Sequence, residues 1–177
     1  MTRAQLEHLI RASGDIADDD EIIVIGSQAI LAQFPDAPSD LLVSVEADVY
    51  PKNRPERADL IDGTIGELSP FHETYGYYAQ GVGETTAVLP AGWNERLIPV
   101  RNANTRGVTG WCLEACDLGV AKLVAGRDKD TRFLASALKH GLIDVSVLRA
   151  RLALTELALE IRRAAEVRLV DLANRAG

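Results

Sequence analysis

The segments EIIVIGS, residues 21–27, and LVSVEADV, residues 42–49, decide the fold of this chain. Both are short apolar runs that favour β-strands, and the first ends in the pair Gly26-Ser27. Successive side chains of a strand point to opposite faces, so Glu46 and Asp48 lie on one face and the valines lie on the other. The sequence therefore predicts two strands, with a Gly-Ser turn after the first and two neighbouring acids on the second.

These two features together point to phosphate and metal chemistry. Two carboxylates held side by side repel each other unless a cation lies between them, and a divalent ion such as Mg²⁺ prefers oxygen ligands. The turn at Gly26 and Ser27 offers backbone N–H groups and a small hydroxyl that can approach a phosphate closely. A phosphate-binding turn beside the metal-binding acids Glu46 and Asp48 is the minimum equipment for phosphoryl or nucleotidyl transfer.

Length and composition fit a folded protein with one core. The chain has 177 residues, of which 47% are hydrophobic and 25% are charged. The formal net charge of −7 argues against a protein that coats nucleic acid non-specifically, but it leaves room for a local grip on one nucleotide or RNA end. We find no signal peptide and no run long enough to span a bilayer, and Cys112 and Cys116 fit a reducing compartment. We therefore expect a cytoplasmic protein with no membrane partner.

The pattern of the chain predicts a mixed sheet followed by helices. Thr2 is a plausible cap for a first helix through about Ser13, and the acidic run 18–21 reads as a solvated loop. Before residue 115, further helices are predicted over 28–34 and 55–62, and further strands over 75–82, 86–89, 97–100 and 108–113. Beyond it, helices are predicted over 117–125 and 131–140, from Asp144, and from Thr155 to Asn174.

The sequence thus predicts an α+β fold in which a mixed sheet of four to six strands is flanked by helices. Residues 1–114 form the predicted α/β core. Residues 115–177 form a helical C-terminal region that packs on this core, so that the whole chain is one compact unit. The helical region leaves three readings open: packing on the core, a homodimer seam, or a groove for a protein partner.

A second charged group begins in the helical region. Lys122 and Lys129 are seven residues apart, so they would share a face if one helix contained both. A lysine near a triphosphate neutralises the charge that builds on the leaving pyrophosphate. The alternative for Lys122 is a lysine whose stem packs on an apolar surface while its ammonium reaches water. Asp128 and Asp130 stand at a spacing that favours capping of the next helix, which does not exclude a catalytic role.

Two other groups have open readings. Lys52, Arg54 and Arg57 follow directly after the acids, where they either hold RNA or a nucleotide phosphate or are simple solvated charge. His72 lies in a predicted turn, and a lone histidine there favours a surface or structural role over a place in a nucleotide pocket.

In this order, the Gly26-Ser27 turn, the acids Glu46-x-Asp48 and the segment DLGVAKLVAGRDKD, residues 117–130, resemble the AbiEii-type nucleotidyltransferases. This group belongs to the polymerase-β-like superfamily and includes the MenT-like toxins of toxin–antitoxin systems. The resemblance spans about residues 21–141 and is strongest to a bacterial branch of short, single-domain proteins.

The resemblance implies a nucleotidyltransferase-like fold and an enzyme that needs Mg²⁺ as its cofactor. Such an enzyme transfers a nucleoside monophosphate from a nucleoside triphosphate (NTP) to an acceptor, which for the toxin branch is a tRNA 3′ end or a protein side chain. An antitoxin is then a further partner. Carried over by position, the roles are phosphate contact for Gly26 and Ser27, Mg²⁺ binding and catalysis for Glu46 and Asp48, triphosphate binding for Lys122 and Lys129, and acceptor orientation or base catalysis for Asp130.

Two features differ from the superfamily pattern. Glu46 stands where aspartate is usual, and its extra methylene moves the metal-binding oxygen by about a bond length. No third carboxylate lies in a clean strand pattern. An alternative reading is therefore a nucleotidyltransferase fold that has lost catalysis and serves as a nucleotide-binding or protein-interaction module. A structural protein with no nucleotide site is the third reading.

Overall fold

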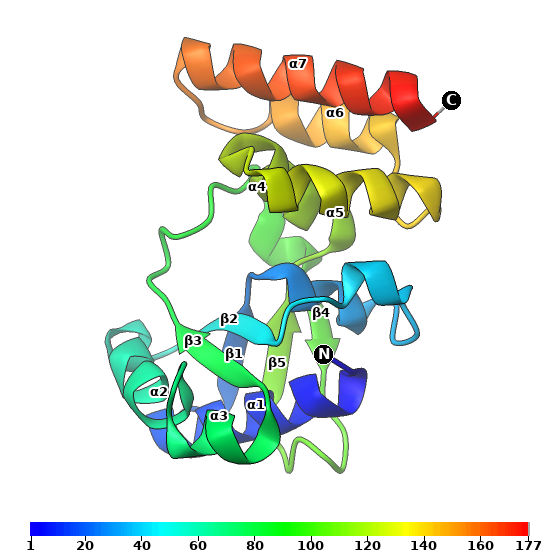
Figure 1. Ribbon diagram of the computed structural model, residues 1–177. Coiled ribbons are helices and arrows are strands. Elements are labelled where there is room, and N and C mark those ends of the chain that lie inside the picture. The colour runs from blue at the N-terminus through cyan, green and yellow to red at the C-terminus, as the bar shows by residue number, and fades with distance from the viewer. Residues whose placement is uncertain (177) are drawn as a thin grey trace. The chain divides into compact units, whose positions relative to one another are not determined.

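The apolar run that begins at Glu21 forms strand β1 (Glu21–Val24), the central strand of a five-stranded mixed sheet. The computed structural model, which describes residues 1–176, gives the strand order β3-β2-β1-β5-β4 (Figure 1). β1 runs antiparallel to β2 (Glu46–Pro51) and parallel to β5 (Thr109–Cys112). β3 (Tyr78–Gly81) is parallel to β2, and β4 (Ile98–Val100) is antiparallel to β5. The predicted α+β class and mixed sheet are confirmed.

The chain divides into two compact units. The first consists of residues 1–86 and 97–114 and contains the whole sheet; the second consists of residues 87–96 and the chain from Ala115 onward. In the first unit, α1 (Arg3–Ala17) and α2 (Ala58–Ile65) pack against the strands. This packing excludes water from a core whose largest fully buried side chains include Leu6, Leu9, Ile10, Ile22 and Ile61.

Helix α1 begins where the sequence predicts and ends one turn later. Thr2 and Gln5 form a capping box at its start, and Asp18 follows its end in the left-handed conformation. Gly14 lies inside the helix, where a Cβ would come within 2.7 Å of the Val108 side chain. The glycine therefore marks close packing at this position, although the sequence pattern alone indicates a helix end.

Strand β2 begins at Glu46, four residues later than predicted. The Val43 and Val45 side chains are 79% and 44% exposed, so the face opposite the acids is buried only from Ala47 onward. The Ser44 hydroxyl accepts a hydrogen bond from the Glu46 N–H at 3.1 Å, and the residues before it form a short 3₁₀ turn, η2 (Ser39–Leu41). The alternation of apolar residues therefore begins four residues before the strand itself does.

Several other predicted elements are corrected. Residues 70–75 form helix α3 (Pro70–Tyr75), which Ser69 caps by accepting from the His72 N–H, and residues 86–89 form no strand. The predicted helix over 28–34 is the 3₁₀ helix η1 (Ser27–Ala32). The predicted helix over 55–62 is the turn η3 (Pro55–Arg57) followed by α2. Asp19 is not solvated, because it is 7% exposed and accepts hydrogen bonds from the N–H groups of Glu21, Asn53 and Arg54.

The helices of the second unit begin with the 3₁₀ helix η4 (Trp93–Arg96). The unit also contains α4 (Ala115–Ala125), α5 (Asp128–Lys139), α6 (Val145–Ala153) and α7 (Leu159–Ala176), and α4 contacts the other three α-helices. At Gly119, a Cβ would lie 2.6 Å from the Leu148 side chain, so α4 and α6 approach closely there. No helix within residues 1–176 combines the length and apolar character needed to cross a bilayer.

The predicted helix caps of the second unit are partly confirmed. Asp144 caps α6 by accepting from the N–H groups of Ser146 and Val147. Thr155 does not cap α7, which begins at Leu159; its hydroxyl instead donates to the Arg151 carbonyl at 3.0 Å.

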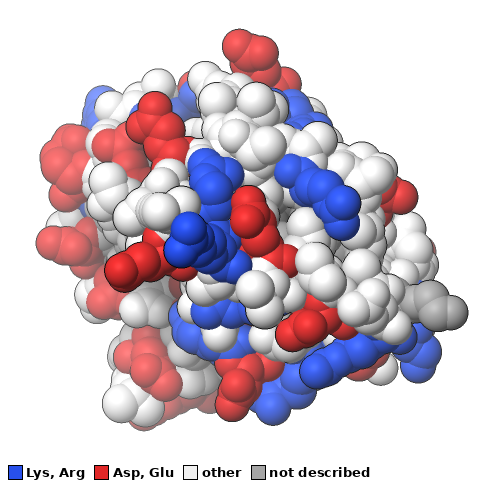
Figure 2. Space-filling model, turned by 90° about the horizontal axis from the view of Figure 1, so that it is seen from above, with Lys and Arg blue, Asp and Glu red and all other residues white. Residues whose placement is uncertain are grey.

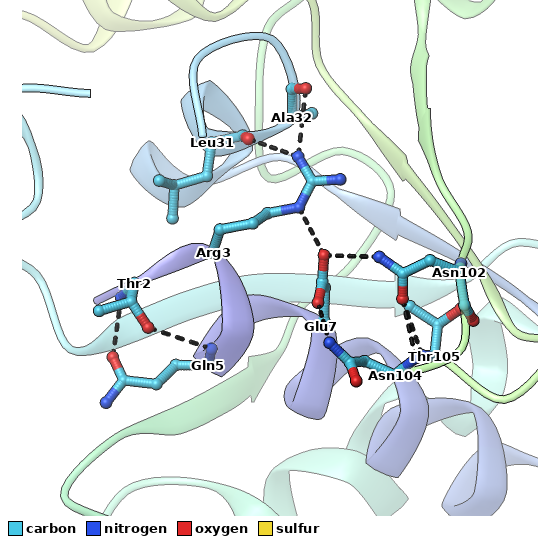
Figure 3. A network of polar contacts seen from close by, with 9 residues as sticks. All are labelled: Thr2, Arg3, Gln5, Glu7, Leu31, Ala32, Asn102, Asn104 and Thr105. Carbon is cyan, nitrogen blue, oxygen red and sulfur yellow. Dashed lines mark hydrogen bonds and ion pairs between the residues drawn. The ribbon is translucent and has the colours of Figure 1, made fainter. Parts of the chain in front are cut away.

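A polar network joins α1 to η1 and to the loop after β4 (Figure 3). Arg3 donates to the Leu31 carbonyl at 2.6 Å and to the Glu7 carboxylate at 2.9 Å. Asn102 and Asn104 donate to the two oxygens of the same carboxylate at 2.7 and 2.8 Å. Burial alone would raise the pKa of Glu7, but the hydrogen bonds from Asn104, Asn102 and Arg3 outweigh it and lower that pKa. The network therefore fixes the end of η1 through a buried, ionised glutamate.

We predict that Glu7→Gln destabilises the protein by about 1–3 kcal/mol at pH 7, because a charged acceptor of three hydrogen bonds is lost. Since the folded pKa of Glu7 is lowered, its contribution is present above its ordinary pKa of 4.5 and is lost as the pH falls through the folded value. Urea unfolding followed by circular dichroism between pH 7 and pH 3 measures the difference. An equal loss at all pH values, or an equal loss for the exposed Glu56→Gln, would contradict this prediction.

Candidate functional site

The Gly-Ser turn and the second acid meet in the first unit. The Ile25 N–H donates to the Asp48 carbonyl at 3.0 Å, which continues the pairing of β1 and β2 up to the turn. At Gly26, a Cβ would lie 2.2 Å from Oδ2 of Asp48 and 2.9 Å from its Cγ. Any other residue at this position would require the Asp48 carboxylate to move. The structure therefore brings Gly26 and Asp48 into direct contact.

Glu46 and Asp48 are two residues apart on β2, so both project from the same face, and both are half-buried. The neighbouring strand β3 places Tyr78 opposite Glu46 and Gln80 opposite Asp48. Neither partner is a carboxylate. Within residues 1–176, no group of three or more His, Cys, Asp or Glu side chains is arranged to hold a metal ion. A metal at this face would therefore have at most two such protein ligands among the described residues.

Tyr78 is a site residue that the sequence did not reveal. Its hydroxyl donates to Oε2 of Glu46 at 3.4 Å, and its ring centroid lies 4.6 Å from that of His72. Burial, followed by the charges of Glu46 and Glu67, raises the pKa of Tyr78 to about 12. The hydroxyl thus stays protonated, and it donates, across the neutral pH range. The pairing of β2 with β3 brings Tyr78 here, and no local sequence pattern encodes that pairing.

Ser27 is the first residue of η1 and is half-buried. The next side chain, Gln28, is fully buried and donates to the Ser44 carbonyl at 3.1 Å. Two carbonyls at the other end of η1, those of Leu31 and Ala32, accept from Arg3. Contacts at both ends therefore hold the segment that follows the turn.

Lys122 and Asp130 form a buried ion pair in the second unit. Nζ of Lys122 lies 3.1 Å from Oδ1 of Asp130 and 4.4 Å from the centroid of the Phe133 ring. Arg127 donates to both Asp130 oxygens, at 2.6 and 3.3 Å. The Asp130 side chain is fully buried, whereas Lys129 is exposed.

This geometry corrects two expectations. The chain breaks between α4 and α5 at Gly126, which has φ +63, so Lys122 and Lys129 do not share one continuous helix face. Asp128 is the first residue of α5, and the N-cap position is held by Arg127, whose side chain makes no capping hydrogen bond, so neither Asp128 nor Asp130 is the N-cap residue. Asp130 is instead the common acceptor for two cations.

Burial and the charge of the partner both act on the pKa values of Lys122 and Asp130. Burial lowers the pKa of Lys122, against the opposing effect of the Asp130 charge. Burial alone would raise the pKa of Asp130, but the hydrogen bond from Arg127 and the charge of Lys122 outweigh it, so that pKa is lowered. A carboxylate held ionised in this way is well suited to position cations.

A second buried aspartate, on α4, accepts hydrogen bonds from two arginines. Asp117 is fully buried and accepts from Arg96 at 2.8 and 3.1 Å and from Arg151 at 2.7 Å. Its carboxylate therefore ties residues 87–96 and α6 to α4. Sequence patterns did not indicate this role for Asp117, because its partners are 21 and 34 residues away along the chain.

The basic residues after the acids are engaged elsewhere in the first unit. Lys52 pairs with Glu21 at 2.7 Å, and Arg54 and Arg57 pair with Asp18. Lys52 follows the far end of β2, roughly 13 Å along the strand from Asp48. These contacts indicate that the three residues are solvated, ion-paired charges rather than phosphate-binding groups.

A family model described as "Nucleotidyltransferase of unknown function (DUF6036)" matches residues 4–174 of the chain. No curated protein and no solved structure gives a significant match. The family match covers both units, including every residue predicted for the site.

We predict that Lys122→Met destabilises the protein by up to about 3 kcal/mol, because it leaves the buried Asp130 with Arg127 as the partner of its carboxylate. The matched control is Lys129→Met, which removes an exposed lysine and should change stability by less than about 0.5 kcal/mol. Urea unfolding of both variants provides the measurement. Equal effects of the two substitutions would refute the importance of the buried pair.

Proposed function

The chain belongs to the DUF6036 family of nucleotidyltransferases, and on that premise we propose that it transfers a nucleoside monophosphate from an NTP to an acceptor with Mg²⁺ as cofactor. The observation that carries this proposal is the contact between Gly26 and Asp48, where a Cβ would lie 2.2 Å from the carboxylate oxygen. A turn suited to phosphates and an acid suited to a metal are thereby fixed next to each other in one unit.

The donor set on β2 fits Mg²⁺. This ion is commonly bound through one or two carboxylates and completes its octahedron with water and substrate phosphates. Glu46 and Asp48 supply two half-buried carboxylates on one face, and the strand beside them adds no third. When bound, Mg²⁺ would neutralise charge on the phosphates and make the α-phosphate a better electrophile.

The chain's own groups have separate tasks in this proposal. Gly26 and Ser27 contact the phosphates through backbone N–H groups and the hydroxyl, and glycine lets the phosphates approach the main chain. Glu46 and Asp48 hold the cation. The acceptor attacks the α-phosphate in line with the departing pyrophosphate, so orientation and charge stabilisation supply most of the catalysis.

The assignments in the second unit stay predictions. Lys122 and Lys129 are assigned to the triphosphate, and Asp130 to the acceptor or to base catalysis. The pairing of Asp130 with Lys122 and Arg127 supports a task in holding cations, because a doubly paired carboxylate is a poor proton acceptor. Phe133 and Asp130 together restrict the Lys122 side chain, so its ammonium is already ordered before any ligand binds.

For the acceptor we propose a tRNA 3′ end or a protein side chain, in a toxin of a toxin–antitoxin system. Figure 2 shows a face on which Lys and Arg side chains lie among Asp and Glu side chains. That face offers no continuous basic surface for a long nucleic acid backbone, and the net charge of −7 points the same way. An acceptor held at one end through few contacts fits both observations.

A second candidate is a member of the family that binds nucleotides without turnover. Glu46 in place of the usual aspartate, and Tyr78 and Gln80 as the residues that face the two acids, favour it. The two candidates share nucleotide binding and differ in the release of pyrophosphate.

We predict that Asp48→Asn removes the Mg²⁺-dependent part of NTP binding and lowers pyrophosphate release by at least about 100-fold, with the fold intact. Calorimetric titration of ATP, GTP, CTP and UTP, with and without Mg²⁺, measures binding. Pyrophosphate release is measured with a total tRNA fraction as acceptor.

The control variant is Asp59→Asn, which removes an exposed acid on α2 and should behave as the unchanged protein. Undiminished NTP binding and turnover in Asp48→Asn would contradict the proposal that the two acids hold Mg²⁺. Metal-dependent binding that Asp48→Asn removes, without pyrophosphate release from any acceptor, would favour the second candidate.

A further inference from the structure

The position of Tyr78 beside Glu46 is set by the sheet. In the parallel pair of β2 and β3, Tyr78 lies directly opposite Glu46, and its hydroxyl donates to Oε2 at 3.4 Å. Residues opposite each other on adjacent strands share a face, so the phenol can reach only the acid face of the sheet. The Tyr78 side chain is 7% exposed.

Helix α3 and the turn before it hold the Tyr78 ring from the other side. The His72 ring centroid lies 4.6 Å from that of Tyr78, and Nδ1 of His72 accepts from the Leu68 N–H at 3.1 Å. Leu68 has φ +62, a left-handed conformation that costs a leucine backbone free energy. Ser69 caps the helix through the His72 N–H, so His72 is fixed at both its backbone and its ring.

We propose that Tyr78 is a positioning residue that orients Glu46 for Mg²⁺, an inference that rests on the proposed function. A glutamate has one more rotatable bond than an aspartate, so its carboxylate needs a partner to hold one orientation. The Tyr78 hydroxyl donates to Oε2 of Glu46, so Oε1 would be the oxygen that Glu46 offers to a cation. Hydrogen-bond partners of metal ligands typically change metal affinity 10–100-fold.

The neighbouring tyrosine provides a matched control. Tyr77 is 8% exposed, and its hydroxyl bonds to Nδ1 of His8 at 2.8 Å, among the rings of Phe71 and Tyr75. Tyr77→Phe and Tyr78→Phe each remove one hydroxyl from a tyrosine, and the two tyrosines are similarly buried. Only the Tyr78 hydroxyl touches a proposed metal ligand.

The test measures the Mg²⁺ concentration that gives half-maximal NTP binding, by calorimetry with the four ribonucleoside triphosphates. Tyr78→Phe should raise this concentration about tenfold, with no change in NTP binding without metal. Tyr77→Phe should change neither quantity. Thermal unfolding without ligands reports on folding of each variant.

Glu46→Asp supplies an independent variant, because its shorter side chain no longer reaches the Tyr78 hydroxyl. In that background, adding Tyr78→Phe should have no further effect on the half-saturating Mg²⁺ concentration. A Tyr78→Phe protein with unchanged Mg²⁺ dependence, or a Tyr78→Phe effect of the same size in the Glu46→Asp background, would overturn the inference while the proposed function stands. A protein that binds no NTP with Mg²⁺ would overturn both.

Discussion

The contact between the Gly26 backbone and the Asp48 carboxylate is the constraint on which the candidate site depends. Pairing of Val24 with Val49 brings the end of β1 beside the middle of β2, and the Ile25 N–H extends this pairing to the Asp48 carbonyl. A one-residue slip in this register would turn both acids to the opposite face of the sheet. The register and the missing Cβ together place a carboxylate against the turn.

Each unit contributes charge of a different kind. In the first, two half-buried carboxylates, Glu46 and Asp48, project from one strand face. In the second, Asp117 and Asp130 are fully buried, and each accepts from two cationic side chains. Buried carboxylates with several partners order the cationic side chains around them, at a cost in desolvation.

The sequence indicated the parts of the structure that depend on local patterns. The α+β class and the order of turn, strand and acids follow from apolar runs and a Gly-Ser pair, and the family match supports the nucleotidyltransferase reading. The exact start of β2 did not follow, because Val43 and Val45 alternate like strand residues but are exposed. Helix α3 was not predicted, because the sequence pattern placed His72 in a turn, although Ser69-Pro70 is a typical helix start.

The remaining differences come from contacts between distant residues. Tyr78 reaches Glu46 through strand pairing across 32 positions, and no spacing rule connects them. Asp130 stands at a spacing typical of a helix cap, yet it is buried because Lys122 and Arg127 converge on it. The assignment of each predicted residue to a nucleotide, a metal or an acceptor remains a proposal, since these roles depend on ligands that the sequence and the fold only suggest.

The most direct measurement is an anomalous difference map from crystals grown with Mn²⁺, as a substitute for Mg²⁺, and a non-hydrolysable NTP analogue. We expect a metal peak about 2.1 Å from one oxygen of Glu46 and one oxygen of Asp48, with the phosphates at Gly26 and Ser27. Nucleotide bound elsewhere, or metal bound away from both carboxylates, would contradict the proposal that this face of β2 is a metal and nucleotide site.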